Sequence, residues 1–382
     1  MGLNAYTKWV VGTALPFWST TGFDEVRGRF FERLDWTGQP VLSAPHRAMV
    51  QARQIYVFAH AALLGWFPGG RVAEIAMASL LRDFQDKSSR SAGLAFSVSV
   101  DGVIVSDVRD AYTHAFVLFA IAWLYRLNGD TQLLVVADEV IGFIDARLED
   151  PVNAGLFDMF PVTDQCKRQN PHMHLLEAYL ALEAAAPGRG YLERAKKLIG
   201  ILKTYLYNAE KRVLLEYFAA DWSEHPDPAK SHVFEPGHHF EWVWLLHEYE
   251  KVSAEDLGFW ITQLDESARY NGLTEEGLIF DEVSADMQVC KQSHRIWPHT
   301  EAMKAAVARY SKGDQDATHF ADLMARSLME NFLDKPFSGG WIDHILADRQ
   351  PLVTFVPASS LYHLFLAASE LARGFRMEVR PA

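Results

Sequence analysis

The sequence has little of several features that mark common protein classes. Its two cysteines, Cys166 and Cys290, are too few for a disulfide scaffold and lack the spacing of metal ligands. Its formal net charge of −13 argues against nucleic acid as a partner, because phosphate binding needs clustered Lys and Arg, and weighs mildly against a strongly anionic substrate. Reduced thiols in a cytoplasm are the simplest account of the two cysteines.

The N-terminal region has no apolar run long enough to span a bilayer. The stretch from Trp9 to Phe17 is interrupted by Pro16 and preceded by one basic residue, Lys8, which makes a poor signal peptide. Tyr6 stands where a myristoylation signal has Ser or Thr. We therefore expect a cytoplasmic protein that binds neither a membrane nor nucleic acid.

The sequence also lacks the short motifs of several catalytic classes. It contains no H-E-x-x-H, no paired cysteines and no aspartate-rich loop, and it has no serine-nucleophile or phosphate-loop signature. Fifteen histidines remain as the main chemical resource. We therefore expect acid–base chemistry by histidine, with no cofactor and no metal.

What the sequence does have is helical periodicity along its whole length. Candidate helices run at about 22–33, 46–63, 70–88, 110–127, 130–147, 170–186, 188–206, 237–250, 253–270, 294–310, 315–331 and 356–374, with a further short helix at about 4–18. Short extended pieces are expected at 96–105, around the turn signal Asp101-Gly102, and at 213–218, 278–283 and 341–346. All of them fall between an odd-numbered helix and the next even-numbered one, so they should gather at one end of the molecule.

No linker rich in Pro, Gly or Ser divides the chain, which predicts one catalytic domain over residues 1–382. Six helical hairpins, each of about 64 residues, can close into an (α/α)6 barrel or stack as an open solenoid. Closure is favoured, because no short sequence motif recurs and because the even-numbered helices are rich in internal polar residues. The expected fold is all-α, an (α/α)6 barrel of about twelve helices with short β-hairpins in the loops at one end.

The polar residues that look chemical lie on every second predicted helix, so an alternation of outer and inner helices would bring them to one cavity. In chain order they are Arg53, His114, His174, His238 with Glu241, Glu301 and His363. His238 and Glu241 form an i, i+3 pair at a helix start, and a carboxylate beside an imidazole can orient it and raise its pKa. The alternative interpretation of an isolated histidine, such as His172 or His363, is a structural residue bonded to a loop or buried in the core.

Five segments together resemble the N-acylglucosamine 2-epimerase superfamily, which includes sugar 2-epimerases and mannose–fructose aldose–ketose isomerases. They are Gln51-Ala52-Arg53, Asn170 to Tyr179, Gly237-His238-x-x-Glu241, Trp297-Pro298-x-x-Glu301 and Tyr362-His363. The resemblance covers nearly the whole chain, in order, and it implies an (α/α)6 barrel.

The resemblance implies a role for each matching residue. His238 and His363 correspond to the two acid/base histidines, and Arg53 to the arginine at the reacting end of the sugar. His174, with Asn170 beside it, corresponds to a histidine of ring opening or substrate binding. Glu241 corresponds to the carboxylate that supports His238, while Tyr112 and Trp297 are expected to line the pocket.

Two departures from the family pattern bear on the substrate. Met49 stands where many relatives carry Trp, and the segment Ser359-Ser360-Leu361-Tyr362-His363 is closer to the isomerase branch. The leading hypothesis is therefore an aldose–ketose isomerase acting on a free monosaccharide such as mannose. The alternatives are a 2-epimerase of mannose or an N-acylhexosamine, a glycoside hydrolase on the same barrel, and a non-enzymatic solenoid. A homodimer would be ordinary for such an enzyme, but no segment identifies its interface.

Overall fold

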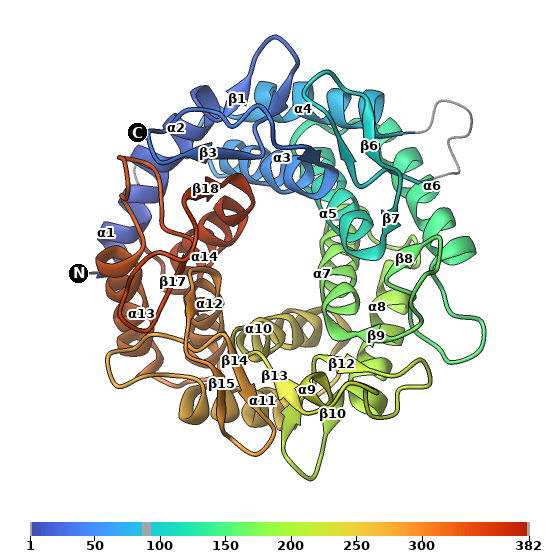
Figure 1. The fold of residues 1–382 in the computed structure, drawn as a ribbon, viewed down its shortest axis with the longest axis vertical. Coiled ribbons are helices and arrows are strands. Elements are labelled where there is room, and N and C mark those ends of the chain that lie inside the picture. Colours follow the sequence, from blue (N-terminus) through green and yellow to red (C-terminus); the bar gives the residue numbers. More distant parts are fainter. Residues whose placement is uncertain (1, 86–92, 380–382) are drawn as a thin grey trace.

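Two concentric rings of helices make up the fold of this computed structural model, which describes residues 2–85 and 93–379 (Figure 1). The inner ring consists of α3 (Ala48–Leu63), α5 (Ala111–Asn128), α7 (Gln169–Ala185), α10 (Pro236–Ser253), α12 (Trp297–Ser311) and α14 (Leu361–Gly374). Each inner helix packs against the next, and α14 returns to pack against α3. The ring is therefore closed, as the barrel hypothesis predicted, and the open solenoid is excluded.

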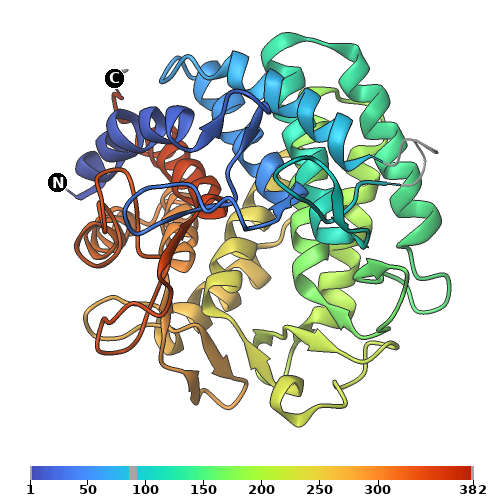
Figure 2. The same ribbon diagram turned by 45° about the horizontal axis from the view of Figure 1, so that its top comes forward.

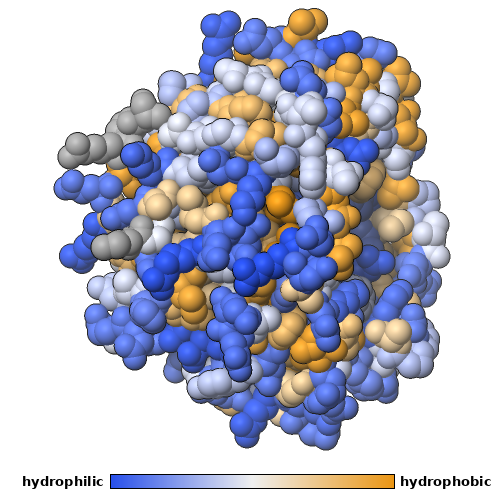
Figure 3. All heavy atoms as spheres, turned by 60° about the vertical axis from the view of Figure 1, so that its left-hand side comes forward, coloured by the Kyte–Doolittle hydropathy of each residue, from blue (hydrophilic) through white to orange (hydrophobic). Residues whose placement is uncertain are grey.

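The outer ring covers the inner one. It consists of α1 (Gly2–Trp9), continued by the π-helical turn η1 (Val10–Ala14) and α2 (Leu15–Thr20), then α4 (Gly70–Phe84), α6 (Thr131–Arg147), α8 (Tyr191–Ile201) with the π-helical turn η3 (Leu202–Leu206), α11 (Gly258–Asn271) and α13 (Ala317–Asn331). Inner helix α3 is buried on all sides from Ala48 to Ala61, whereas α8 buries one face only. Hydrophilic residues dominate the outer face in Figure 3, with apolar patches between them.

Every strand among the described residues lies in a connection from an outer helix to the next inner helix (Figure 2). The strands are β1 (Phe23–Asp24), β2 (Arg29–Phe30), β3 (Arg33–Asp35), β4 (His46–Arg47), β5 (Ser97–Val98), β6 (Ile104–Ser106), β7 (Arg109–Asp110), β8 (Met159–Phe160), β9 (Lys167–Arg168), β10 (Tyr207–Asn208), β11 (Val213–Leu214), β12 (Tyr217–Phe218), β13 (Val233–Phe234), β14 (Glu282–Ser284), β15 (Val289–Lys291), β16 (His294–Arg295), β17 (His344–Ile345) and β18 (Phe355–Pro357). The short helix α9 (Pro228–Ser231) and the 3-10 turn η4 (Ala358–Ser360) lie in these connections too.

The strands join each connection to the next one around the barrel. The antiparallel pairs β4–β5, β7–β8, β9–β12, β13–β14 and β16–β17 each link two successive connections, and β18–β3 links the last connection to the first. This circle of backbone hydrogen bonds closes the same end at which the inner helices begin. It fixes where each inner helix starts.

One predicted helix is wrong. Residues 22–33 form the antiparallel pair β1–β2, with Phe23 opposite Phe30. Gly28 has a φ of 70°, and the Asp24 side chain accepts hydrogen bonds from the backbone N–H groups of the turn, which together favour a tight turn over a helix. The outer-ring helix that precedes α3 is instead formed by α1, η1 and α2, the segment predicted as the short helix 4–18.

A recurring side-chain anchor holds the inner helices to the preceding connection. Near the start of three of these helices, α5, α7 and α12, Nδ1–H of a histidine donates to the carbonyl four residues earlier, while Nε2 accepts a backbone N–H from the connection. The anchors are His114 (2.7 and 3.0 Å), His172 (2.8 and 2.9 Å) and His299 (3.1 and 3.3 Å). His239 accepts the N–H of Leu214, and Gln51 bonds both backbone groups of Phe30.

These contacts correct one site prediction and settle one alternative. His114 anchors α5 and does not line the cavity that Arg53, His174, His238, Glu241 and His363 share, while His172 is the loop-bonded structural residue of its pair. Burial lowers the pKa of His172 to about 4 and that of His299 to about 3, so both rings stay neutral and keep one donor and one acceptor nitrogen.

Among the described residues, none of the helices has both the length and the apolar character that a bilayer crossing requires.

We predict that His172→Ala lowers the free energy of unfolding by about 2–4 kcal/mol, because it leaves the buried backbone N–H of Leu156 without its partner and removes the bond to the Arg168 carbonyl. Urea unfolding measures the loss. The control is His232→Ala, whose side chain is exposed beside Glu224 and whose loss should cost under about 0.5 kcal/mol. Equal losses in the two variants would contradict the anchoring role.

Candidate active site

A cavity of about 320 Å³ lies where the inner helices begin. It is lined by Arg47, Met49, Arg53, Tyr112, Asn170, His174, Glu235, His238, Glu241, Arg295, Trp297, Asp343, Ser359, Ser360 and His363. All eight residues that the sequence singled out as catalytic or substrate-binding are among them. The structure therefore brings these eight residues together in one cavity.

Helix geometry explains why these residues meet. Successive residues of an α-helix are rotated by about 100°, so two residues that are two positions apart differ by about 200° and lie on nearly opposite faces of the helix. The anchors Gln51, His172 and His239 point outward to the connections, and the residues two positions later point inward to the axis. These inward residues are Arg53, His174 and Glu241, each of which lines the cavity.

The imidazole of His238 is fixed by a carboxylate from another part of the chain. Its Nδ1 lies 3.0 Å from both carboxylate oxygens of Glu216, and Glu235 is 3.8 Å away. Gln169 Nε2 and the backbone N–H of Glu235 donate to the same Glu216 carboxylate. Burial opposes the positive charge, but Glu216 and Glu235 outweigh it and raise the pKa of His238 to about 9. His238 is therefore an imidazolium at neutral pH.

The imidazole of His363 has the opposite character. Its Nδ1–H donates to Glu301 at 2.8 Å, and Glu301 pairs with the fully buried Lys304 at 2.5 Å. Burial favours the neutral acid, yet Lys304 outweighs it and lowers the pKa of Glu301 to about 2. Burial, with the charges of Arg53 and Lys304, lowers the pKa of His363 to about 3. At neutral pH this ring is neutral, which leaves Nε2 as a base.

Trp297 lies beside both imidazoles. Its ring centroid is 4.9 Å from that of His238 and 5.6 Å from that of His363. One indole therefore forms the cavity wall beside both rings.

Arg53 brings a positive charge to the cavity without a carboxylate partner among the described residues. Its Nη2 donates to Tyr112 Oη at 2.6 Å and its Nη1 to the carbonyl of Ser359 at 3.2 Å. Its guanidinium carbon lies 4.2 Å from the centre of the Phe116 ring. Since neutral groups alone hold it, this guanidinium can stabilise negative charge that develops on a ligand oxygen.

Glu241 does not have the role that the resemblance implied. The carboxylate on His238 is Glu216, whereas Glu241 lies 3.9 Å from Nδ1 of His174. His174 also contacts Glu177 at 3.1 Å, and burial holds the pKa of His174 well below its usual range. Burial, with the charge of Glu301, raises the pKa of Glu241 well above its ordinary value, which favours its protonated form.

Sequence reasoning missed several residues at the cavity. Glu216 lies in a connection just before β12, and no motif marks it. Arg47 and Glu235 directly precede an inner helix, and Arg295 lies two residues before one, so a charged residue next to a helix start was the available signal. Asp343 also lies in a connection, and no sequence motif marks it. Burial raises its pKa, and Ser360 donates a hydrogen bond to it.

Three groups of His and Glu atoms are close enough to hold a metal ion, namely His174–Glu177–Glu241, Glu216–Glu235–His238 and Glu241–Glu301–His363. In each group Nδ1 of the histidine already faces a carboxylate, and Lys304 neutralises Glu301. Hydrogen bonds within each group therefore explain why its His and Glu atoms lie so close together. Chemistry without a cofactor stays a prediction.

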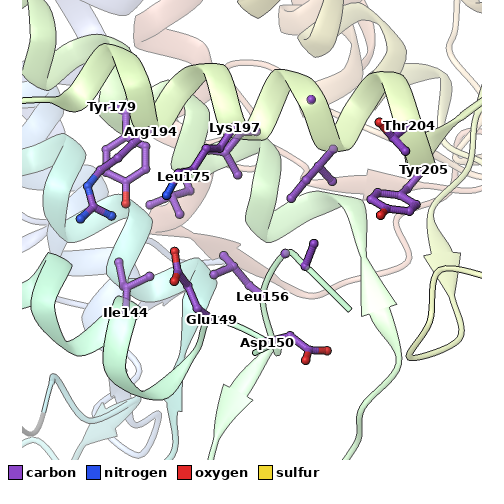
Figure 4. A pocket seen from close by; sticks show the side chains of 15 residues that line it. Ile144, Glu149, Asp150, Leu156, Leu175, Tyr179, Arg194, Lys197, Thr204 and Tyr205 are labelled. Atoms are coloured by element: carbon purple, nitrogen blue, oxygen red, sulfur yellow. The ribbon is translucent and has the colours of Figure 1, made fainter. Parts of the chain in front are cut away.

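A larger pocket, of about 410 Å³, lies between α6, α7 and α8 (Figure 4). Arg194, Lys197 and Glu149 face it, together with Tyr179 and Tyr205. No imidazole lines it, and Arg194 is held by Asp145 in a double hydrogen bond of 2.7 and 2.6 Å. The chemistry of the residues, rather than the size of the hollow, therefore identifies the candidate active site.

The raised pKa of His238 predicts a pH-dependent stability. A group whose folded pKa of about 9 exceeds its unfolded value stabilises the fold fully below the unfolded pKa of about 6.5 and loses that contribution as pH rises through 9. We expect the stability difference between wild type and His238→Gln to shrink by on the order of 3 kcal/mol from about pH 6 to about pH 9.5. Denaturant unfolding at several pH values measures it, and a difference independent of pH would contradict the charge assigned to His238.

Comparison with known proteins gives a consistent picture. The sequence profile of the N-acylglucosamine 2-epimerase (GlcNAc 2-epimerase) family matches residues 29–367. A mannose-6-phosphate isomerase of Rhizobium meliloti (strain 1021) is 30% identical over 373 residues, which cover 95% of both chains.

Solved structures share the fold at lower identity. A cellobiose 2-epimerase from Bacillus thermoamylovorans B4167 superposes with a TM-score of 0.87 at 19% identity, covering 98% of this chain and 99% of the other. A D-mannose isomerase superposes with a TM-score of 0.85 at 20% identity, covering 97% of both. Since epimerase and isomerase structures fit almost equally well, the fold does not discriminate between the two reactions. The chain belongs to the N-acylglucosamine 2-epimerase family and is a sugar epimerase or isomerase.

Proposed function

We propose that the protein is a sugar isomerase that interconverts an aldose and a ketose of the mannose/fructose type, without a cofactor, through a cis-enediol. The observation that carries the proposal is the pair of cavity histidines with opposite protonation. His363 is a neutral base, His238 is an imidazolium acid, and Arg53 is a cation without a carboxylate partner among the described residues. The relative named for mannose-6-phosphate isomerase supports a substrate of the mannose type.

The first half of the reaction forms the enediol from the open-chain aldose. Nε2 of His363 takes the proton from C2, and the C2–H electron pair becomes the C1–C2 double bond. The electrons of the C1–O1 double bond move to O1, which receives a proton from His238. Arg53 stabilises the negative charge that develops on O1. Glu301 stabilises the imidazolium that forms at His363.

The second half returns both protons. The O2–H proton moves to the now neutral His238, the C2–O2 double bond forms, and the C1–C2 double bond takes the proton from His363 at C1. The product is the 2-ketose, and both histidines regain their starting states. Glu216 keeps Nδ1 of His238 occupied throughout, so proton exchange with the ligand is confined to Nε2.

Three further residues have proposed binding roles. His174, with Asn170 beside it in the cavity, assists ring opening or holds the sugar hydroxyls. Glu241, as a neutral acid, donates a hydrogen bond to a sugar oxygen. Tyr112 and Trp297 complete the wall around the reacting carbons.

The second candidate is a 2-epimerase of mannose or of an N-acylhexosamine. It is kept beside the isomerase because solved epimerase and isomerase structures fit this fold almost equally well. The same residues serve it: His363 removes the C2 proton and His238 delivers a proton to the opposite face of C2. A hydrolase on the same barrel and a non-enzymatic solenoid are set aside, because the ring is closed and the family is one of epimerases and isomerases.

Proton NMR of D-mannose incubated with the enzyme in D2O tests the proposal. Fructose with deuterium at C1 is the expected product, because the proton held by His363 can exchange with solvent during turnover. Glucose in its place would establish the 2-epimerase, and unchanged mannose would contradict the proposed substrate.

In the same assay, His363→Ala should lower kcat/KM by about 10²–10⁴-fold, as expected for loss of a general base. The control is His60→Ala, which removes a buried histidine at the opposite end of the inner helices and should keep most of the activity per folded molecule.

A further inference from the structure

A second hollow, of about 330 Å³, adjoins the catalytic cavity through Arg47, which lines both. We call it the side pocket and define it by Glu32, Arg33, Arg47, Phe96 and Phe355. Its walls are largely apolar, so its few charged groups determine what it can recognise.

The charges of the side pocket do not cancel. Glu32 is paired with Arg47. Nε of Arg47 donates to one oxygen of the Glu32 carboxylate at 2.6 Å, and the backbone N–H of Arg47 donates to the other at 2.9 Å. These two bonds fix the stem of Arg47, and its Nη atoms make no hydrogen bond to any residue in 2–85 or 93–379.

Arg33 is the second cation. Its guanidinium carbon lies 4.5 Å from the centre of the Phe355 ring, and it forms no ion pair with the described residues. Two guanidinium groups therefore face the side pocket against one carboxylate. Helix α3 begins at Ala48, directly after Arg47, so the positive end of its dipole adds to the same charge.

Backbone contacts tie this pocket firmly to the catalytic helices. Arg33 lies on β3 opposite Pro357 of β18, and the carbonyl of Glu32 accepts the N–H of Ala358. Strand β18 leads through η4 into α14, which carries His363, while Arg47 leads directly into α3, which carries Arg53. A group held between Arg33 and Arg47 thus has a fixed position relative to the reacting atoms.

We propose that the side pocket binds an anionic group on C6 of the hexose, the end of the open chain remote from C1. This inference rests on the proposed function, because it places C1 and C2 at Arg53, His238 and His363. The planar forks of Arg33 and Arg47 suit a phosphate or a carboxylate, and Phe96 and Phe355 pack against the carbon chain. The overall charge of −13 does not describe this hollow, whose lining is cationic.

Substrate comparison tests the proposal. For the wild-type enzyme, kcat/KM should be at least about ten-fold higher for D-mannose 6-phosphate or D-mannuronate than for D-mannose, as one charge-assisted contact allows. The better of the two anions shows whether the pocket prefers phosphate or carboxylate. Equal or lower kcat/KM for both anions than for mannose would overturn the proposal.

The decisive variant is Arg33→Gln, because Arg33 lies outside the catalytic cavity. It should lower kcat/KM for the preferred anionic sugar by at least about ten-fold and change that for mannose by less than about two-fold. The matched control is Arg71→Gln, which removes the same charge from an exposed position on α4 and should change neither value. An equal effect of Arg33→Gln on both sugars would contradict anion recognition.

Binding of an unreactive ligand separates failure of this inference from failure of the proposed reaction. Calorimetric titration with D-mannitol 6-phosphate and with D-mannitol needs no turnover. Tighter binding of the phosphate, lost in Arg33→Gln, supports the side pocket even if no sugar is isomerised. Equal affinities for the two polyols would overturn it even if mannose is converted.

Discussion

The hydrogen bonds from Nδ1 of His238 to Glu216 and from Nδ1 of His363 to Glu301 are the interactions on which the site depends. Both rings are buried in the same cavity, and burial alone would make both neutral. The difference is that Glu216 acts on His238 together with Glu235, whereas the charge of Glu301 is already taken up by Lys304. Two identical side chains thereby become one acid and one base at the same pH. Each carboxylate also occupies Nδ1, so the ring nitrogen left for the ligand is Nε2 in both.

The barrel supplies the positions that this arrangement needs. Strand pairs link every connection to the next, and side-chain anchors such as His172 bind the starts of α3, α5, α7, α10 and α12 to their connections. Because the anchor and the residue two positions later lie on opposite faces, a helix tied to the outer wall must present that residue to the axis. The same closure buries Lys304 and Glu301, which isolated helices would leave in water.

Much of the fold and of the site could be predicted from the sequence, because helical periodicity and family motifs are local. All eight predicted site residues line the cavity, and eleven of the twelve main helices overlap the ranges that the periodicity predicted, although α11 and α14 begin five residues later than predicted. Residues 22–33 were mistaken for a helix, since apolar spacing outweighed the turn chemistry of Asp24 and Gly28. His114 was taken for a cavity residue because it lies near the start of an inner helix, as the cavity histidines do, and the sequence does not show that it bonds to the backbone instead. Glu216 was missed, and Glu241 credited with its role, since the pairing across 22 residues depends on strand and helix packing that no local pattern encodes.

The central claim is that the two cavity histidines differ in charge, and histidine-selective NMR of the labelled protein tests it most directly. At about pH 7.5 the account predicts that both ring nitrogens of His238 carry protons, while His363 is neutral with its proton on Nδ1. Spectra of His238→Gln and His363→Gln assign the two sets of ring signals. Finding both rings neutral, or both charged, would contradict the account.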